Sequence, residues 1–210
     1  MNEVNSIFYI VVLIMSIVIH EVSHGLAADL MGDKTARLAG RLNLNPIKHI
    51  DMFGSIILPA FMLLSDTGLL FGWAKPVPYN PANFKNNRLG TIVVASAGIV
   101  ANLLIAIAFG LLIKFSPSLG LNSTSFLVIA SMISAINIVL AIFNLIPLPP
   151  LDGSKVLFSA LPPRFKYIEY KLSKYSIILL FILIFFMWKY IYPNIVLVYN
   201  FITGGAVPII

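Results

Sequence analysis

Long apolar runs dominate this sequence and restrict its fold more than any other feature. They lie at about residues 6–31, 89–113, 125–146 and 175–190, and an apolar tail, 193–210, is interrupted by Pro193 and glycines. A helix rises ~1.5 Å per residue, so about 20 apolar residues cross the ~30 Å hydrocarbon core of a bilayer. The chain is 59% apolar and only 10% charged, whereas a typical soluble domain is about 25% charged. We therefore predict an all-α polytopic membrane protein with about four transmembrane helices.

The remaining composition narrows the possible functions. The 210 residues are expected to form one membrane-embedded domain, 1–210, without a separate soluble domain. The net charge of +6 does not indicate nucleic-acid binding, because the Lys and Arg residues lie in loops between the apolar runs. The chain has no Cys, so any bound metal must be held by His, Asp or Glu. The N-terminal run lacks a basic leader and a cleavage site, so we expect it to remain as a span.

The segment between the first two runs, about residues 40–81, does not resemble a simple transmembrane helix. Its apolar part, 52–71, is interrupted by glycines, Pro59 and Asp66, and GWAKPVPYNP (72–81) predicts extended chain because of its prolines. Basic residues flank the segment on both sides, and loops rich in Lys and Arg stay in the cytoplasm. A re-entrant segment that returns to its own side keeps both flanks cytoplasmic, and we prefer it to the alternative of a full transmembrane helix.

Residues His20-Glu21-Val22-Ser23-His24 form an HExxH motif inside the first apolar run. Two His residues four positions apart share one helix face, so both rings can bind one ion. Zinc accepts imidazole ligands, and the neighbouring Glu can take a proton from zinc-bound water. A pair of packed histidines is the alternative, but it does not explain a carboxylate at membrane depth, where ionisable groups are costly. We predict a zinc site with His20 and His24 as ligands and Glu21 as the general base.

A catalytic zinc site usually has three protein ligands and a water, so a third ligand is needed. Asp152, in NLIPLPPLDG (144–153), is the preferred candidate. Its prolines open the backbone at the end of the third apolar run, on the same side as the two His residues under the predicted topology. Taken alone, Asp152 would more simply be the N-cap of a following helix. His49 and Asp51 are the next candidates for the third ligand.

These motifs, in this order, resemble the site-2 protease family of intramembrane metalloproteases. The resemblance runs from about residue 15 to 160 and is carried by HEVSHG (20–25), LNPIKHID (44–51), GWAKPVPYNP (72–81), AGIVAN (97–102) and NLIPLPPLDG (144–153). It implies one zinc ion per chain, bound by His20, His24 and Asp152, with Glu21 catalytic. It also implies a re-entrant, partly β segment after the motif helix. Many members carry a PDZ or CBS domain, and because neither is visible here we expect a minimal form.

Three asparagines lie within the apolar runs. The family's membrane-embedded Asn corresponds to Asn144, so the resemblance implies a catalytic role in which its amide holds a substrate carbonyl or an oxyanion. An interhelical hydrogen bond is the alternative for Asn144. Asn102 follows a face of small residues that includes Gly98, which is typical of close helix contacts, and we interpret both Asn102 and Asn137 as packing residues.

Together these features predict an intramembrane zinc metalloprotease that hydrolyses peptide bonds within or near transmembrane segments of membrane proteins, as in regulated intramembrane proteolysis. Its partners are transmembrane substrates and the lipid bilayer, with no nucleic acid. We expect a multi-pass protein of the cell membrane with its active site toward the cytoplasm. A metal transporter or channel is the non-enzymatic alternative, but it predicts repeated polar positions or an inverted repeat, and neither is visible. A protease acting on prenylated or lipid-linked C-termini is the second enzymatic alternative.

Overall fold

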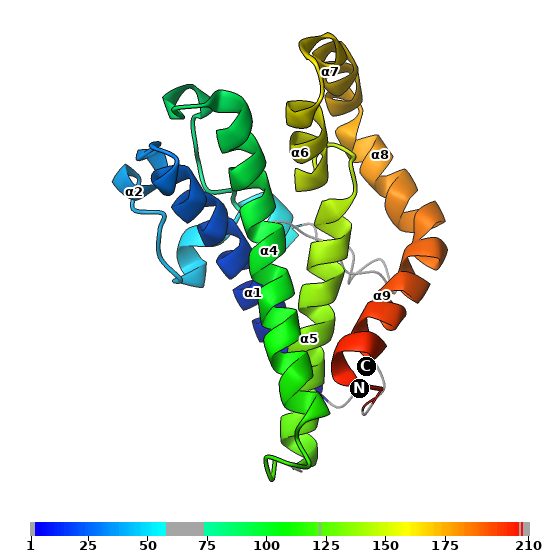
Figure 1. Cartoon of the computed structure of the whole chain (residues 1–210). Helices are drawn as coiled ribbons and strands as arrows, with labels where there is room; N and C mark the ends of the chain where they lie inside the picture. Colours follow the sequence, from blue (N-terminus) through cyan, green and yellow to red (C-terminus); the bar gives the residue numbers. More distant parts are fainter. Residues whose placement is uncertain (1–2, 58–73, 122, 206, 208–210) are drawn as a thin grey trace.

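Three long helices form the body of the protein. The computed structural model describes residues 3–57, 74–121, 123–205 and 207. In this part of the chain, α1 (Glu3–Leu30), α4 (Asn87–Lys114) and α5 (Thr124–Leu145) are long and apolar enough to cross a membrane. They pack side by side (Figure 1). The prediction of an all-helical, multi-pass membrane protein is confirmed for the described residues.

Local sequence signals set the helix ends that lead to the site. The Asn86 side chain accepts a backbone N–H from the first turn of α4 and so caps this helix. Helix α5 ends at Leu145, and the prolines within 147–150 that follow have no N–H with which to continue it. The chain then turns into the short helix α6 (Asp152–Ala160), so Asp152 lies directly after the proline-broken stretch.

The C-terminal region differs from the single span predicted at 175–190. After η4 (Pro163–Phe165), the chain forms α7 (Lys166–Lys174), α8 (Ser176–Ile182), a π-helical turn η5 (Leu183–Met187) and α9 (Trp188–Thr203). The stretches Ser176–Phe186 and Trp188–Thr203 meet at a bend of 68°, and together they make at most one broken span. Helix α9 continues through Pro193, where we expected an interruption. Apolar helices tolerate proline when packing against their neighbours compensates for the missing hydrogen bond.

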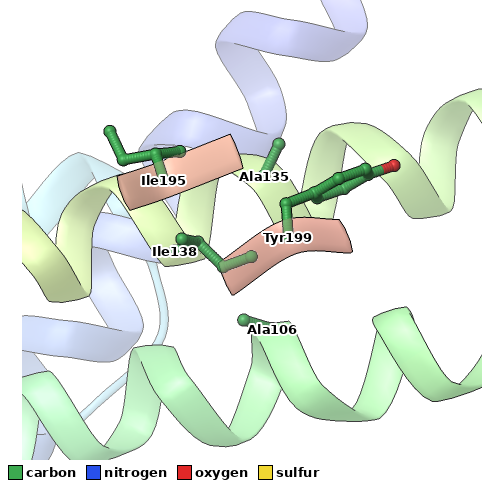
Figure 2. Close-up of a cluster of buried hydrophobic side chains, with 5 residues drawn as sticks. All are labelled: Ala106, Ala135, Ile138, Ile195 and Tyr199. Atoms are coloured by element: carbon green, nitrogen blue, oxygen red, sulfur yellow. The ribbon is translucent and has the colours of Figure 1, made fainter. Parts of the chain in front are cut away.

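That packing is visible in a cluster of buried apolar side chains. Ile195 and Tyr199 of α9 lie against Ala135 and Ile138 of α5 and against Ala106 of α4 (Figure 2). All five side chains are buried. The two alanines allow the helix backbones to approach closely, as small residues do in membrane helix pairs. The C-terminal helix is therefore part of the same helical unit as α4 and α5.

In its described residues, the segment between α1 and α4 is irregular rather than partly β. Its described parts are α2 (Thr35–Leu38), η1 (Pro46–His49), the π-helical turn η2 (Met52–Ile57), an extended stretch at 74–80 and η3 (Pro81–Asn83). No strand is present in the described parts of the predicted range 40–81, which corrects that prediction. The prolines of the extended stretch have no N–H to donate to a strand ladder, so this sequence favours isolated hydrogen bonds over a sheet.

Isolated hydrogen bonds join the two described ends of this segment. The Lys75 N–H donates to the His49 carbonyl at 2.9 Å, and the Arg41 guanidinium donates to the Lys75 carbonyl at 2.9 Å. The chain therefore returns to the end of α1 from which it left. Residues 58–73 lie outside the described residues, so the re-entrant path between these ends stays a prediction.

Asp33, just beyond the end of α1, holds the returning chain. Its buried carboxylate accepts hydrogen bonds from the Asn80 N–H at 2.6 Å and from the Asn83 side-chain amide at 2.7 Å. It also accepts from the N–H and hydroxyl of Thr35. Burial by itself raises the pKa of Asp33, but the bonds from Thr35, Asn83 and Asn80 outweigh it and the pKa lies below its usual value. The ionised side chain is thus part of the folded structure.

Candidate metal centre

His20, His24 and Asp152 meet in one buried cluster. The Oδ2 atom of Asp152 lies 3.1 Å from His20 Nε2 and 3.0 Å from His24 Nε2. The two Nε2 atoms are 3.0 Å apart, and the imidazole rings are nearly perpendicular, at 89°. Among the residues that the structure describes, these three form the group of His, Asp and Glu side chains that could hold a metal ion.

The hydrogen-bond partner at Nδ1, on the side of each ring away from the cluster, decides which ring nitrogen carries the hydrogen. His20 Nδ1 is 2.5 Å from the Asn102 side-chain oxygen, and His24 Nδ1 is 2.7 Å from the Val94 carbonyl oxygen. Carbonyl and amide oxygens only accept hydrogen bonds, so both Nδ1 atoms must carry the hydrogen. When neutral, each ring therefore presents the lone pair of Nε2 to the same point, as a metal ligand does.

Asp152 is the first residue of α6 and not its N-cap. Leu151 occupies the cap position and no side-chain cap bond is present. The Asp152 carboxylate is used elsewhere, with Oδ2 facing the two imidazoles and Oδ1 bonded to the Lys155 ammonium at 3.1 Å. The capping alternative is therefore wrong, and Lys155 leaves only one oxygen of Asp152 directed at the imidazoles.

Glu21 lies beside the cluster and is held by the extended stretch at 74–80. Its Oε2 atom accepts the Val77 N–H at 2.9 Å. The Glu21 side chain is partly exposed, while Val77 is buried. Because the donor is a backbone group between two prolines, the carboxylate is anchored by the shape of the chain rather than by a mobile side chain.

The other candidate residues have different surroundings. Asn144 is partly exposed, and its amide donates to the Leu140 carbonyl at 3.0 Å, one turn earlier in its own helix. His49 Nε2 donates to the Asn43 carbonyl at 2.9 Å. Asp51 accepts two backbone N–H groups of η2. His49 and Asp51 thus stabilise the loop after α1, and their described hydrogen bonds do not join them to the cluster.

The donor set fits zinc. Two neutral imidazole nitrogens and one carboxylate oxygen are a common protein set for this ion, whose ligands at ~2.0–2.1 Å in a tetrahedron lie about 3.3 Å apart. The separations of 3.0–3.1 Å in this cluster are close to that value. Two lone pairs and a carboxylate oxygen repel one another at such distances unless a cation or a proton lies between them.

Fold and cluster together define a class: a multi-pass helical membrane protein with a buried site that could hold a metal ion. The model of peptidase family M50 matches residues 8–125 and 118–187, and the chain belongs to this family. A Bacillus subtilis (strain 168) protein named "Putative zinc metalloprotease YwhC" is 36% identical over 181 residues, which cover 84% of this chain and 79% of that protein. No solved structure matches the chain. The protein is thus a zinc metalloprotease, and the family resemblance inferred from the motifs is confirmed.

Sequence analysis missed one feature of the site. Asn102 and Asn137 are fully buried, as a packing role requires, but Asn102 also bonds directly to a ring of the cluster. Gly98 lies one turn before Asn102 on α4, and a Cβ added there would meet the His20 ring. The signal was the spacing of four residues between Gly98 and Asn102, which puts a small residue and an amide on one face of α4.

Proposed function

We propose that this zinc metalloprotease cuts its substrates inside the bilayer, with His20, His24 and Asp152 as the protein ligands of a single zinc ion. The observation that carries the proposal is the convergence of three electron-rich atoms, all within 3.0–3.1 Å of one another, between the apolar helix α1 and the start of α6. Both histidines direct lone pairs at that point because their Nδ1 hydrogens are bonded elsewhere.

The depth of the cluster supports cleavage within the membrane. His20 lies about ten residues before the end of the candidate span Ile7–Leu30, which is roughly 15 Å along the axis at ~1.5 Å per residue. A substrate peptide bond that reaches this depth lies in or near a transmembrane segment. Transmembrane proteins are therefore the proposed substrates, and regulated intramembrane proteolysis is the proposed process.

Glu21 is the proposed general base. Zinc bound at such a site supplies Lewis acidity, which polarises a carbonyl and makes a water molecule easier to deprotonate. The Glu21 carboxylate, anchored through Oε2 by the Val77 N–H, has its other oxygen available to accept that proton. It can then deliver the proton to the leaving amine, as general acid–base groups do.

Asn144 is the proposed ligand of the substrate carbonyl. Its amide nitrogen has two hydrogens, and one of them bonds the Leu140 carbonyl. The second can donate to a substrate carbonyl or to a developing oxyanion. Asn144 is the second-last residue of α5, and the proline-broken stretch that follows this helix leads to Asp152, so both residues depend on the same local backbone.

The active site is proposed to face the cytoplasm of a cell membrane. The end of α1 nearest the site is followed by Lys34, Arg37, Arg41 and Lys48. Loops rich in Lys and Arg stay in the cytoplasm. Two hydrogen bonds, from the Lys75 N–H to the His49 carbonyl and from the Arg41 guanidinium to the Lys75 carbonyl, tie the second basic flank to the same end of α1.

Two variants test the proposal in detergent-purified protein with a model transmembrane substrate. Glu21→Gln keeps an oxygen that can accept the Val77 N–H, so it should retain about one zinc per chain while cleavage falls ~10²–10⁴-fold. Asp152→Asn should lose both zinc and cleavage, because a neutral amide is a poor zinc ligand. Asp29→Asn, which changes another acid of α1 that pairs with Arg37, is the control and should behave like the wild type.

Each part of the proposal has its own contradicting result. Cleavage by Glu21→Gln within tenfold of the wild type would refute the general base. Normal zinc content in Asp152→Asn would refute the third ligand. Mass spectrometry of the products locates the cut, and cleavage confined to a soluble region of the substrate would refute intramembrane proteolysis.

A further inference from the structure

A buried chain of hydrogen bonds runs from the metal cluster across three helices. Asn102 of α4 accepts from His20 Nδ1 at 2.5 Å and donates through its Nδ2 to Asn137 Oδ1 of α5 at 2.7 Å. The Asn137 amide then donates to Ser16 Oγ of α1 at 2.9 Å and to the Ile133 carbonyl at 2.8 Å. Asn102 and Asn137 have no exposed surface, and Ser16 is buried.

The Ile133 carbonyl fixes the direction of every bond in this chain. A backbone carbonyl can only accept, so the nitrogen of the Asn137 side chain must face it and the Asn137 oxygen must face Asn102. Asn102 must then turn its nitrogen toward Asn137 and its oxygen toward His20. His20 Nδ1 must therefore carry the hydrogen, which leaves the lone pair on Nε2.

We infer that Asn102, oriented by Asn137, is a positioning residue that holds His20 in the one tautomer and ring orientation able to bind the metal. This inference rests on the proposed metal site and assigns a function to two residues outside it. Without an acceptor at Nδ1, the ring can place its hydrogen on Nε2, and that atom then has no lone pair for a metal. A partner on the second ring nitrogen of a metal-binding His commonly changes metal affinity 10–100-fold.

Removal of the acceptor is the direct test. Asn102→Leu has nearly the same shape but cannot accept a hydrogen bond, and its zinc affinity, measured by competition with a chromophoric chelator, should fall ~10–100-fold. Asn102→Asp keeps an oxygen toward His20 whichever way it turns, and as the neutral acid it can still donate its hydroxyl to Asn137 Oδ1, so it should remain within about threefold of the wild type. This rescue distinguishes positioning of the ring from simple filling of space.

A second readout reports the tautomer itself. The chain has only 3 His residues, so ¹⁵N-labelling of histidine gives a simple imidazole spectrum. We expect His20, assigned by comparison with His20→Ala, to carry its hydrogen on Nδ1 in the wild type. In Asn102→Leu the same ring should show a mixture of both tautomers. A residue that only packs helices together would not change this signal.

Tyr199→Phe is the matched control for loss of a buried hydrogen bond between helices. The Tyr199 hydroxyl donates to Ser131 Oγ at 2.8 Å, joining α9 to α5 with both residues fully buried. Its removal should leave zinc affinity unchanged. If Asn102→Leu fails to fold, Asn137→Leu replaces it in the test. Asn137→Leu frees the Asn102 amide to turn, so it should weaken zinc binding, whereas Asn102→Asp should not weaken it.

The outcomes separate the inference from the proposed function. Equal zinc binding by the wild type and His20→Ala would mean that the metal site itself is wrong. Zinc binding that needs His20 but is unchanged in both Asn102→Leu and Asn137→Leu would overturn the positioning role alone. Retention of the Nδ1 hydrogen on His20 in Asn102→Leu would overturn it as well.

Discussion

Gly98→Ala should weaken metal binding although residue 98 is not a ligand. A Cβ at this position would lie 2.5 Å from His20 Cε1 and 2.7 Å from both ring nitrogens. Ordinary contact begins at 3.4 Å, so the ring must move by about 0.9 Å, the difference between 3.4 Å and 2.5 Å. Zinc–ligand distances tolerate only ~0.2 Å, so the displaced ring should bind the ion poorly.

The size of the effect follows from the strain. Overpacking of a well-packed interior costs ~1–3 kcal/mol. If the His20 ring moves away and so relieves the strain in the zinc-free protein, zinc binding must bring the ring back and restore the strain. The free energy of zinc binding is then weakened by the same ~1–3 kcal/mol, which corresponds to a loss of about 5- to 150-fold in zinc affinity. The stability of the zinc-free protein should change less, because alanine favours a helix by ~1 kcal/mol over glycine.

Gly110→Ala is the control for this experiment. Gly110 lies on the same helix, and its added Cβ would meet the side chain of Ile202 rather than a ring of the cluster. Zinc affinity by chelator competition and thermal unfolding of the zinc-free protein are measured for both variants. A zinc affinity for Gly98→Ala within twofold of the wild type, or equal losses in the two variants, would refute the reasoning.

Three further predictions concern other parts of the protein. Because the pKa of Asp33 is lower in the folded protein than in the unfolded chain, the stabilisation that its carboxylate gives is complete above the unfolded pKa of ~3.9 and is lost as the pH falls through the folded pKa. Asp33→Ala should therefore lower the free energy of unfolding by about 2–3 kcal/mol at pH 7. A difference from the wild type that does not shrink on acidification would contradict this. Single cysteines at Thr35 and Asn86 should both be shielded from an impermeant reagent in intact cells, and because the chain has no native Cys, labelling of only one of them would make 52–71 a full span. Asn144→Ala should reduce cleavage about 10²–10³-fold with zinc affinity unchanged, and unchanged cleavage would exclude a substrate-binding role.

Much of the helical architecture could be predicted from the sequence, because the bilayer imposes it locally. A run of apolar residues in lipid must satisfy its own backbone, and a helix does so within the run. The ranges 89–113 and 125–146 therefore lie close to the observed α4 and α5. The HExxH spacing likewise places His20 and His24 on one helix face by helical geometry alone.

Features that depend on distant contacts were harder to predict. Helix α9 is not interrupted at Pro193, because Ile195 and Tyr199 pack against neighbouring helices. The expected β character of 40–81 is not found in its described parts, because the bonding partners of Lys75 and Val77 are a loop carbonyl and the Glu21 carboxylate. Such partners lie far away in the chain, so no local pattern reveals them.

The sequence by itself determined that this is a helical membrane protein with two histidines and a glutamate suited to zinc-dependent hydrolysis of peptide bonds. Tertiary structure alone decided that Asp152, 132 residues after His20, turns one oxygen to the histidines and leaves the cap to Leu151. It also brought Asn102 to His20 and Asn137 to Asn102, whereas the spacing in the sequence only placed Gly98 and Asn102 on one face of α4. The physical reason is that periodicity fixes which face a side chain occupies, whereas hydrogen-bond partners depend on how the helices pack together.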